Sequence, residues 1–138
     1  MKALWMTDRG PGLIEQVYQP QVRACLEKEL DFAGFIGSRE NLLAHAGEFD
    51  QVEAVFSTWG MLSLSEEEIR SLLPSLRWLF YGAGSVQAFA RPFLNQGVRV
   101  FSSAAANAVP VAEYAVSQII LANKGFYQAA RLYKENTG

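Results

Sequence analysis

The sequence of 138 residues has few of the residue types from which metal and redox sites are built. It contains one cysteine, Cys25, and one histidine, His45. A single cysteine excludes an intramolecular disulfide and a multi-cysteine metal centre, and we expect Cys25 to be a small residue of the core. His45 stands between two alanines in a short helical stretch, where a surface or partly packed role is expected. No metal site is predicted.

The chain also lacks a cluster of basic residues. It has 12 Lys and Arg residues and 14 Asp and Glu residues, which gives a net charge of −2 and a pI near 5.4. Nucleic acid and anionic membranes both require a clustered basic face, so neither is a predicted partner. The apolar run 116–122 is far shorter than the roughly 20 residues of a membrane span, and no targeting signal opens the chain. We expect a soluble, cytoplasmic protein.

Half of the residues are hydrophobic, and many of them occur in short runs separated by helical patterns. This alternation predicts parallel strands joined by crossover helices, with helices covering both faces of the sheet. The expected fold class is therefore α/β, a flavodoxin-like doubly wound five-stranded parallel sheet with a long C-terminal crossover helix. The five predicted strands are residues 2–7, 32–37, 52–57, 76–81 and 98–102.

Several residues mark where helices begin and end. Pro20 should kink the helical pattern of residues 13–30 or restart it. Ser65 and Glu68 have the spacing of a capping box, which predicts a helix from residue 66 to about 73. Shorter helical segments are expected at 41–46, ended by Gly47, and at 89–95.

The last helix is predicted to run from residue 108 to residue 135, about 40 Å at 1.5 Å per residue. Asn107 is expected to cap it, and Glu113 lies near the positive end of its dipole. Its apolar residues extend beyond one stripe, so it must pack against something besides its own sheet. We therefore expect two domains, residues 1–105 and a crossover helix at 106–138 that joins two copies into a homodimer.

A glycine-rich loop, Gly82 to Ser85, follows the fourth predicted strand. Ligands of open parallel sheets bind beyond the carboxyl ends of the strands, and glycine leaves backbone amides free to hold a carboxylate or a phosphate. An ordinary tight turn is the alternative. Trp59 follows the third strand and is either a core aromatic residue or part of such a site.

Two motifs together resemble the D-isomer-specific 2-hydroxyacid dehydrogenases: the loop YGAGS at 81–85 and the segment SAAANAVPVAEYAVSQIILANKGF at 103–126. The resemblance implies that the amides of Ala83 and Gly84, in the loop with Ser85, hold the carboxylate of a 2-oxo or 2-hydroxy acid. Trp59 or Gly60 would form the opposite wall. It also implies that Val111 lies against the nicotinamide ring of NAD or NADP.

The chain departs from the family pattern at several points. Val86 stands where the family loop commonly has Asp, and Tyr114 stands where a His often follows Glu113. The family's catalytic Arg, Glu and His belong to segments not found here, and no G-x-G-x-x-G unit is present for the pyrophosphate. We therefore expect a chain truncated before the NAD-binding domain, with no catalytic residue of its own and no activity alone.

Two other functions of this fold lack the residues that they require. A receiver domain would need an aspartate after the third strand, where Ser57 and Thr58 stand. A flavodoxin would need a hydroxyl-rich phosphate loop after the first strand, where Pro11 removes an amide donor. The remaining alternative is a stand-alone, non-catalytic dimeric module that binds a small carboxylate or a protein.

Overall fold

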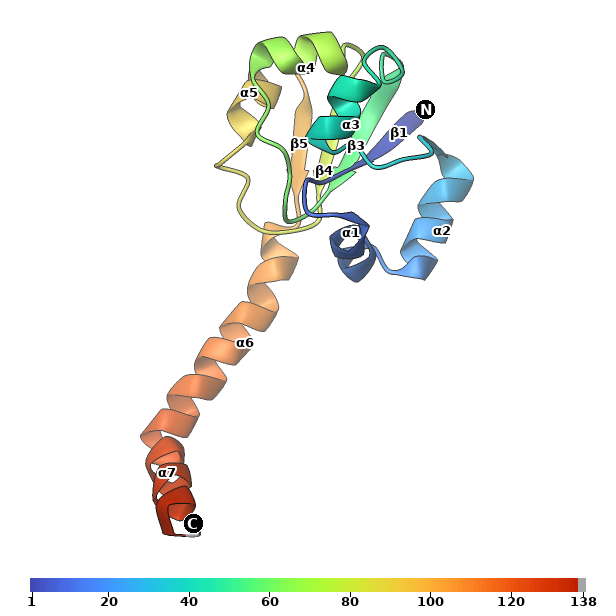
Figure 1. The fold of residues 1–138 in the computed structure, drawn as a ribbon. Coiled ribbons are helices and arrows are strands. Elements are labelled where there is room, and N and C mark those ends of the chain that lie inside the picture. The colour runs from blue at the N-terminus through green and yellow to red at the C-terminus, as the bar shows by residue number, and fades with distance from the viewer. Residues whose placement is uncertain (137–138) are drawn as a thin grey trace. The chain divides into compact units, whose positions relative to one another are not determined.

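The structure is a computed structural model, and it describes residues 1–136. The chain divides into two compact units, Met1–Ala104 and the segment from Ala105 onward. The first, which we call the sheet unit, contains all five described strands (Figure 1). The second, which we call the helical unit, contains the C-terminal helices. Each unit is described by itself.

The sheet unit is built on five parallel strands, as predicted. Their order across the sheet is β2-β1-β3-β4-β5, which is the flavodoxin-like order. Hydrogen-bonded neighbours are in register from Ala54 with Trp78 to Ser57 with Tyr81 across the β3–β4 pair. The strands are β1 (Lys2–Met6), β2 (Asp31–Phe32), β3 (Val52–Ser57), β4 (Trp78–Tyr81) and β5 (Arg99–Ser102).

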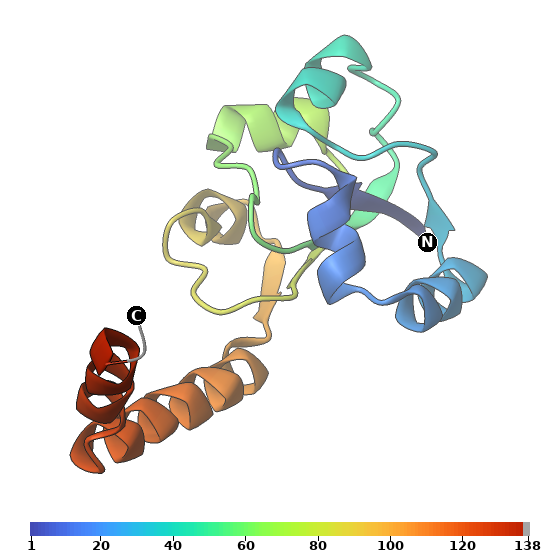
Figure 2. The ribbon, with the colours of Figure 1, turned by 60° about the horizontal axis from the view of Figure 1, so that its bottom comes forward.

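Five helices connect these strands, and the sequence signals explain where they begin. Pro20 occupies the first turn of a new helix, so the pattern of residues 13–30 is divided into two helices, as Figure 2 shows. Ser65 and Glu68 form the predicted capping box, with both reciprocal hydrogen bonds present. The helices are α1 (Pro11–Val17), α2 (Pro20–Glu29), α3 (Arg39–Ala44), α4 (Glu66–Leu72) and α5 (Ala90–Asn95).

The second strand is shorter than predicted. β2 ends at Phe32, and residue 37 returns to the sheet only through a single bridge to Met6. Gly34 interrupts the intervening segment, where a residue without a side chain weakens a strand. Phe35 then packs its ring against Phe49, with centroids 5.4 Å apart. The pairing of β1 with β2 is therefore limited to two residues on each strand.

The alternation of side chains along β1 divides the core into two layers. Leu4 and Met6 belong to the larger cluster, which α3, α4 and α5 complete with residues such as Phe93. Ala3 and Trp5 belong to a smaller cluster with Ile14 of α1 and the partly buried Leu26 of α2. The sheet thus has helices on both sides.

Coverage of the second face is incomplete within the sheet unit. Phe101 on β5 is 47% exposed and stacks on Phe80 of β4, with ring centroids 5.1 Å apart. Phe80 stacks in turn on Phe56 of β3 at 4.8 Å. The predicted fold class is confirmed, with helices on both faces of the sheet. On this face α1 and α2 pack mainly over β1, β2 and β3, while Trp78 and Phe80 of β4 join the same cluster and β5 is covered least.

Cys25 is exposed, so its assignment to the core is wrong. It lies on α2, which has no buried residue and packs on the sheet through partly buried residues such as Leu26. Consecutive helical residues are about 100° apart, which places Cys25 beside this contact stripe. His45 is a helix-terminal residue whose Nδ1 lies 3.0 Å from Glu48 Oε1, consistent with the predicted surface role.

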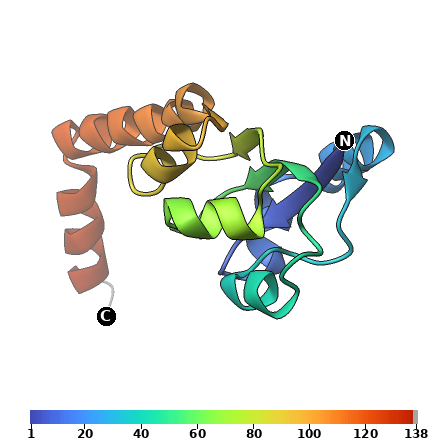
Figure 3. The same cartoon turned by 90° about the horizontal axis from the view of Figure 1, so that it is seen from above.

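The helical unit contains two helices instead of the predicted one. α6 (Ala104–Asn123) and α7 (Phe126–Asn136) are separated at Gly125, whose φ of 68° is incompatible with a continuous right-handed helix. Figure 3 shows the change in direction between them. α6 also begins four residues earlier than predicted. Asn107 is therefore inside the helix and does not cap it.

The apolar part of α6 is longer than the run 116–122. By length and composition alone, Ala104–Asn123 could cross a membrane, with a mean hydropathy of 1.2. The run 116–122 is therefore only part of an apolar segment of 20 residues. Core helices of soluble proteins meet the same criterion, but none of the residues of α6 is buried in the described structure. Its exposed large side chains are Val109, Val111, Tyr114, Val116, Ile119 and Ile120.

Candidate functional site

The candidate site lies where the parallel strands end. Ser57 of β3 pairs with Tyr81 of β4, so the loops 58–61 and 82–85 leave adjacent strands at the same edge. Met6 of β1 pairs with Ser57 on the other side, which brings the loop at 7–10 beside them. The carboxyl edge is the usual ligand-binding edge of an open parallel sheet.

The loop at 82–85 contains unused backbone donors, one of which belongs to the fully buried Ala83. The N–H groups of Ala83, Gly84 and Ser85 donate no hydrogen bond to any residue that the structure describes. By contrast, the N–H of Gly82 donates to the Ser57 carbonyl oxygen at 2.8 Å, which fixes the start of the loop. Successive free amides form a concavity that suits an anion such as a carboxylate.

Ser102 at the end of β5 orients this loop. Its hydroxyl lies 2.5 Å from the Gly84 carbonyl oxygen and 3.2 Å from the Ala83 carbonyl oxygen. In a trans peptide the C=O and the following N–H point in opposite directions. The N–H groups of Gly84 and Ser85 therefore point away from Ser102. Sequence reasoning missed Ser102, because only the fold brings it beside the loop.

Tyr18 supports the same loop from α1. Its hydroxyl donates to the Ser57 and Phe80 carbonyl oxygens at 3.0 and 3.3 Å. Burial raises the pKa of Tyr18 to about 12, so the hydroxyl remains protonated and available as a donor. A Cβ on Gly82 would lie 2.8 Å from Val17 Cγ1 and 3.0 Å from the Tyr18 hydroxyl, so a larger residue here would displace these side chains.

Trp59 and Gly60, predicted to form the opposite wall, belong to the turn that follows β3. Trp59 is 47% exposed, which favours a surface position over the core position that the sequence left open. Thr7 Oγ1 donates to the Trp59 carbonyl oxygen at 3.2 Å, and the Asp8 N–H donates to the Gly60 carbonyl oxygen at 2.9 Å. The turn is thus held by the loop that follows β1.

The predicted site residues are divided between the two units. Trp59 and Gly60 lie at the carboxyl edge of the sheet unit, on the strand next to that of the loop residues Ala83, Gly84 and Ser85. Val111 belongs to α6 in the helical unit and is 61% exposed. The structure therefore brings five of the six predicted residues to neighbouring strand ends.

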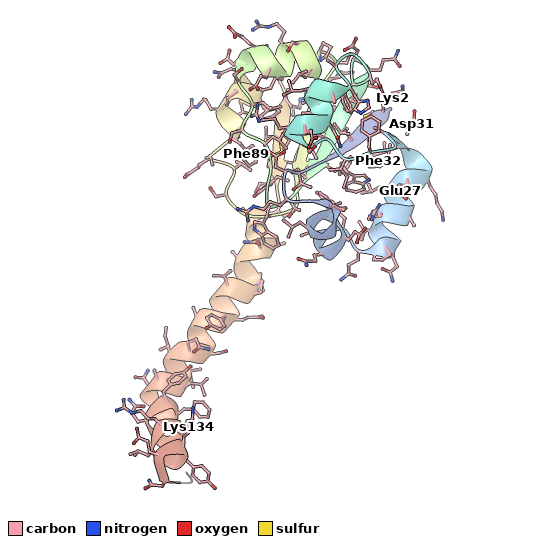
Figure 4. The ribbon with its side chains drawn as sticks, viewed as in Figure 1. Lys2, Glu27, Asp31, Phe32, Phe89 and Lys134 are labelled. Atoms are coloured by element: carbon pink, nitrogen blue, oxygen red, sulfur yellow. The ribbon has the colours of Figure 1, made fainter. Side chains whose placement is uncertain are left out.

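Two hollows of the sheet unit lie away from this edge. One, of about 560 Å³, lies between α2 and β2, and Figure 4 shows three of its lining residues, Glu27, Asp31 and Phe32. Another, of about 720 Å³, is lined by Lys2, Glu53 and other residues at the amino ends of the strands. Neither adjoins the free amides, so the carboxyl-edge loops remain the stronger candidate.

Three solved structures share this fold. The chain is similar to the NAD-dependent formate dehydrogenase from Staphylococcus aureus in complex with NAD, with a TM-score of 0.66, 17% identity and coverage of 99% of this chain. It is also similar to the apo form of D-lactate dehydrogenase from Escherichia coli, with a TM-score of 0.56, 18% identity and 95% coverage. The chain is similar as well to an NAD-binding D-isomer-specific 2-hydroxyacid dehydrogenase from Polaromonas sp. JS6 66, with a TM-score of 0.50, 17% identity and 72% coverage.

The chain spans 41%, 40% and 28% of the lengths of these three proteins, respectively. No protein-family model matches it, and no curated protein matches it by sequence. At such identities the likeness establishes architecture, and activity must be argued from the site. The resemblance inferred from the two sequence motifs is thus matched in three dimensions: the chain has the fold of part of the NAD-dependent formate, D-lactate and D-2-hydroxyacid dehydrogenases.

Proposed function

We propose that this chain is the substrate-binding portion of an NAD(P)-dependent oxidoreductase that interconverts 2-hydroxy acids and 2-oxo acids by hydride transfer. One observation carries the proposal: the free, co-oriented amides of Gly84 and Ser85 lie at the carboxyl edge of a sheet whose fold is shared with such dehydrogenases. Residues 1–105 would form the substrate-binding domain, and residues 106–138 the crossover segment.

In this proposal the loop at 82–85 holds the substrate carboxylate through backbone N–H groups. Fixing the carboxylate on rigid donors orients the adjacent carbonyl or hydroxyl carbon, which lowers the entropic cost of reaction. Trp59 and Gly60 bound the other side and exclude water from the bound acid. These are positioning roles, and none of them transfers a proton or a hydride.

NAD or NADP would supply the hydride, but this chain offers little to hold it. Val111 gives van der Waals contact for a nicotinamide ring, whereas no G-x-G-x-x-G segment is present to bind the pyrophosphate. The main cofactor site and the catalytic Arg, Glu and His would belong to another segment. The isolated chain is therefore proposed to be inactive.

Amide NMR titration of the chain with a 2-oxo acid tests the loop assignment. We expect the resonances of residues 83–85 to shift at millimolar acid, because the carboxylate would accept hydrogen bonds from these amides. Residues at the amino edge, such as Arg77, serve as an internal control and should not shift. An unchanged loop at millimolar acid would remove the support for the proposed function.

The helical unit is proposed to form a homodimer through residues 108–135 in the cytoplasm. Its exposed apolar side chains, including Ile119 and Ile120, have no buried contact in the described chain. Light scattering after size-exclusion chromatography should show a dimer at micromolar concentration. A matched double variant, I119S/I120S, should be monomeric. A monomeric wild-type chain would contradict this part of the proposal.

The second candidate is a stand-alone dimeric module that binds a small carboxylate or a protein. It is favoured by the exposed apolar side chains of α6, none of which is buried among the described residues. Immunodetection of the protein in its native host distinguishes the two functions. A mass more than twice that of this chain supports the dehydrogenase, and a mass near 15.3 kDa supports the stand-alone module.

A further inference from the structure

Arg9 lies in the loop that follows β1 and Arg39 is the first residue of α3, and their guanidinium groups differ in their contacts. Arg39 donates to Glu68 Oε1 and, at 2.6 Å, to the Ser63 carbonyl oxygen. Arg9 forms no ion pair or side-chain hydrogen bond with any residue that the structure describes, and it is exposed. Arg9 is thus a cation at the carboxyl edge without an anionic partner in the described chain.

The stem of Arg9 lies directly on the proposed site wall. A Cβ built on Gly60 would be 2.8 Å from Arg9 Cγ and 3.1 Å from Arg9 Cβ. The Arg9 N–H donates to Thr7 Oγ1 at 3.1 Å, and the same hydroxyl donates to the Trp59 carbonyl oxygen. The position of the Arg9 backbone is therefore coupled to the Trp59–Gly60 turn.

The carboxylate nearest to Arg9 in sequence, that of Asp8, contacts α3. Asp8 Oδ1 accepts a hydrogen bond from the Arg39 backbone N–H at 2.7 Å. No ion pair joins Asp8 and Arg9 among the described residues, although the two are adjacent in sequence. An exposed guanidinium of this kind presents several donors in a planar fork that matches a carboxylate.

We infer that Arg9 forms a second anion subsite, which selects 2-oxo or 2-hydroxy acids that carry a distal carboxylate. The inference rests on the proposed function, because the first carboxylate is assigned to the amides of residues 83–85. β1 and β4 lie on either side of β3, so their loops are separated by roughly 10 Å of sheet. A short dicarboxylic acid and an extended arginine side chain together span that interval, across the exposed Trp59.

The test compares two acids of equal carbon number, 2-oxoglutarate and 2-oxopentanoate, by amide NMR titration of the whole chain. We expect 2-oxoglutarate to bind about fivefold more tightly, which is the effect of one exposed charge pair, and to shift the Arg9 side-chain resonance. The R9Q variant should bind the two acids equally. R77Q is the matched control, because Arg77 precedes β4 at the opposite edge, and it should keep the preference.

Each outcome bears on the two proposals differently. If both acids shift residues 83–85 with equal affinity, or if R77Q removes the preference as fully as R9Q does, the Arg9 subsite is wrong and the carboxylate loop stands. If neither acid shifts residues 83–85, both the proposed function and the Arg9 subsite are overturned. Loss of the preference at high salt in the wild-type chain is expected in addition, since exposed charges are screened.

Discussion

The sheet unit and the helical unit are both rich in apolar residues, but they use them in opposite ways. In the sheet unit, side chains such as Phe93 and Leu79 are fully buried between strands and helices. In the helical unit, no described residue of α6 or α7 is buried. The first unit therefore has a core of its own, whereas the apolar side chains of the second lie at the surface of the described residues.

The largest expected difference between the two units is the loss of unfolding free energy when a large apolar side chain is replaced by alanine. F93A should lower the free energy of unfolding by about 3–5 kcal/mol, because it leaves a cavity in the larger cluster. I120A, on α6, should change it by less than about 0.5 kcal/mol, since Ile120 is 54% exposed. Urea unfolding followed by tryptophan fluorescence at a concentration where the chain is monomeric measures both. Equal losses of unfolding free energy in F93A and I120A would contradict the division into a unit with a core and a unit without one.

A second pair of variants places alanine at a left-handed glycine in each unit. Gly60 has φ of 85° and its missing Cβ would lie 2.7 Å from Thr7 Oγ1, so G60A adds a steric clash to backbone strain. The expected loss is about 3 kcal/mol. At Gly125, with φ of 68° and the nearest atom 4.0 Å away, G125A should cost only about 1 kcal/mol. Thermal unfolding by circular dichroism would show the difference, and the reverse ranking would refute it.

S102A should have a smaller effect on stability and a selective effect on the site. Removing the hydroxyl leaves the Gly84 and Ala83 carbonyl oxygens without this donor, which costs about 1 kcal/mol. The amides of residues 83–85 should then bind a 2-oxo acid more weakly. S117A on α6 is the matched control, because the Ser117 hydroxyl donates to the Glu113 carbonyl oxygen within its own helix. A loss of acid binding in S117A as large as in S102A would argue against the orienting role.

The smallest expected effect concerns pH. The Ser65 N–H, and then the neighbouring Arg39, lower the pKa of Glu68 below its ordinary value of 4.5. A carboxyl whose pKa is lower in the folded state stabilises the protein above the unfolded-state pKa, and this contribution disappears as the pH falls through the folded-state pKa. E68Q should therefore lower the free energy of unfolding by about 0.5 kcal/mol near neutral pH. Below about pH 4.5, the free energy of unfolding of E68Q should depend less on pH than that of the wild-type chain.

The control for this pH effect lies in the helical unit. Glu135 pairs with Arg131 at 3.1 Å on the exposed surface of α7. E135Q should leave the acid dependence of unfolding of the sheet unit unchanged, as measured by tryptophan fluorescence in urea at several pH values. An equally reduced pH dependence of unfolding in E68Q and E135Q would show that Glu68 does not account for the acid dependence.

Local signals in the sequence predicted the elements whose ends are fixed by local chemistry. β3 has its predicted bounds because Val52–Ser57 is a buried apolar run, and Ser65 caps α4 through neighbours only three residues away. Pro20 restarts a helix because its ring fixes φ and removes a donor. The five-stranded parallel sheet and its flavodoxin-like order followed from these elements.

The wrong predictions concern features that depend on distant residues or on a single backbone angle. Gly125 is a visible signal for a helix end, but the apolar pattern continued through it and suggested one helix. The core position expected of Cys25 depended on which face of α2 meets the sheet. Ser102 donates to Gly84, 18 residues away, and Tyr18 donates to Ser57 and Phe80, 39 and 62 residues away, so no local pattern reveals these contacts.

The hydroxyl of Ser102 has one further consequence. It contacts the Gly84 carbonyl oxygen and also accepts the N–H of Ala104, the residue at which α6 begins, at 3.2 Å. One oxygen atom is therefore shared by the loop at 82–85 and the first residue of α6. S102A would remove, in one step, a donor to the loop and the acceptor of the first N–H of α6.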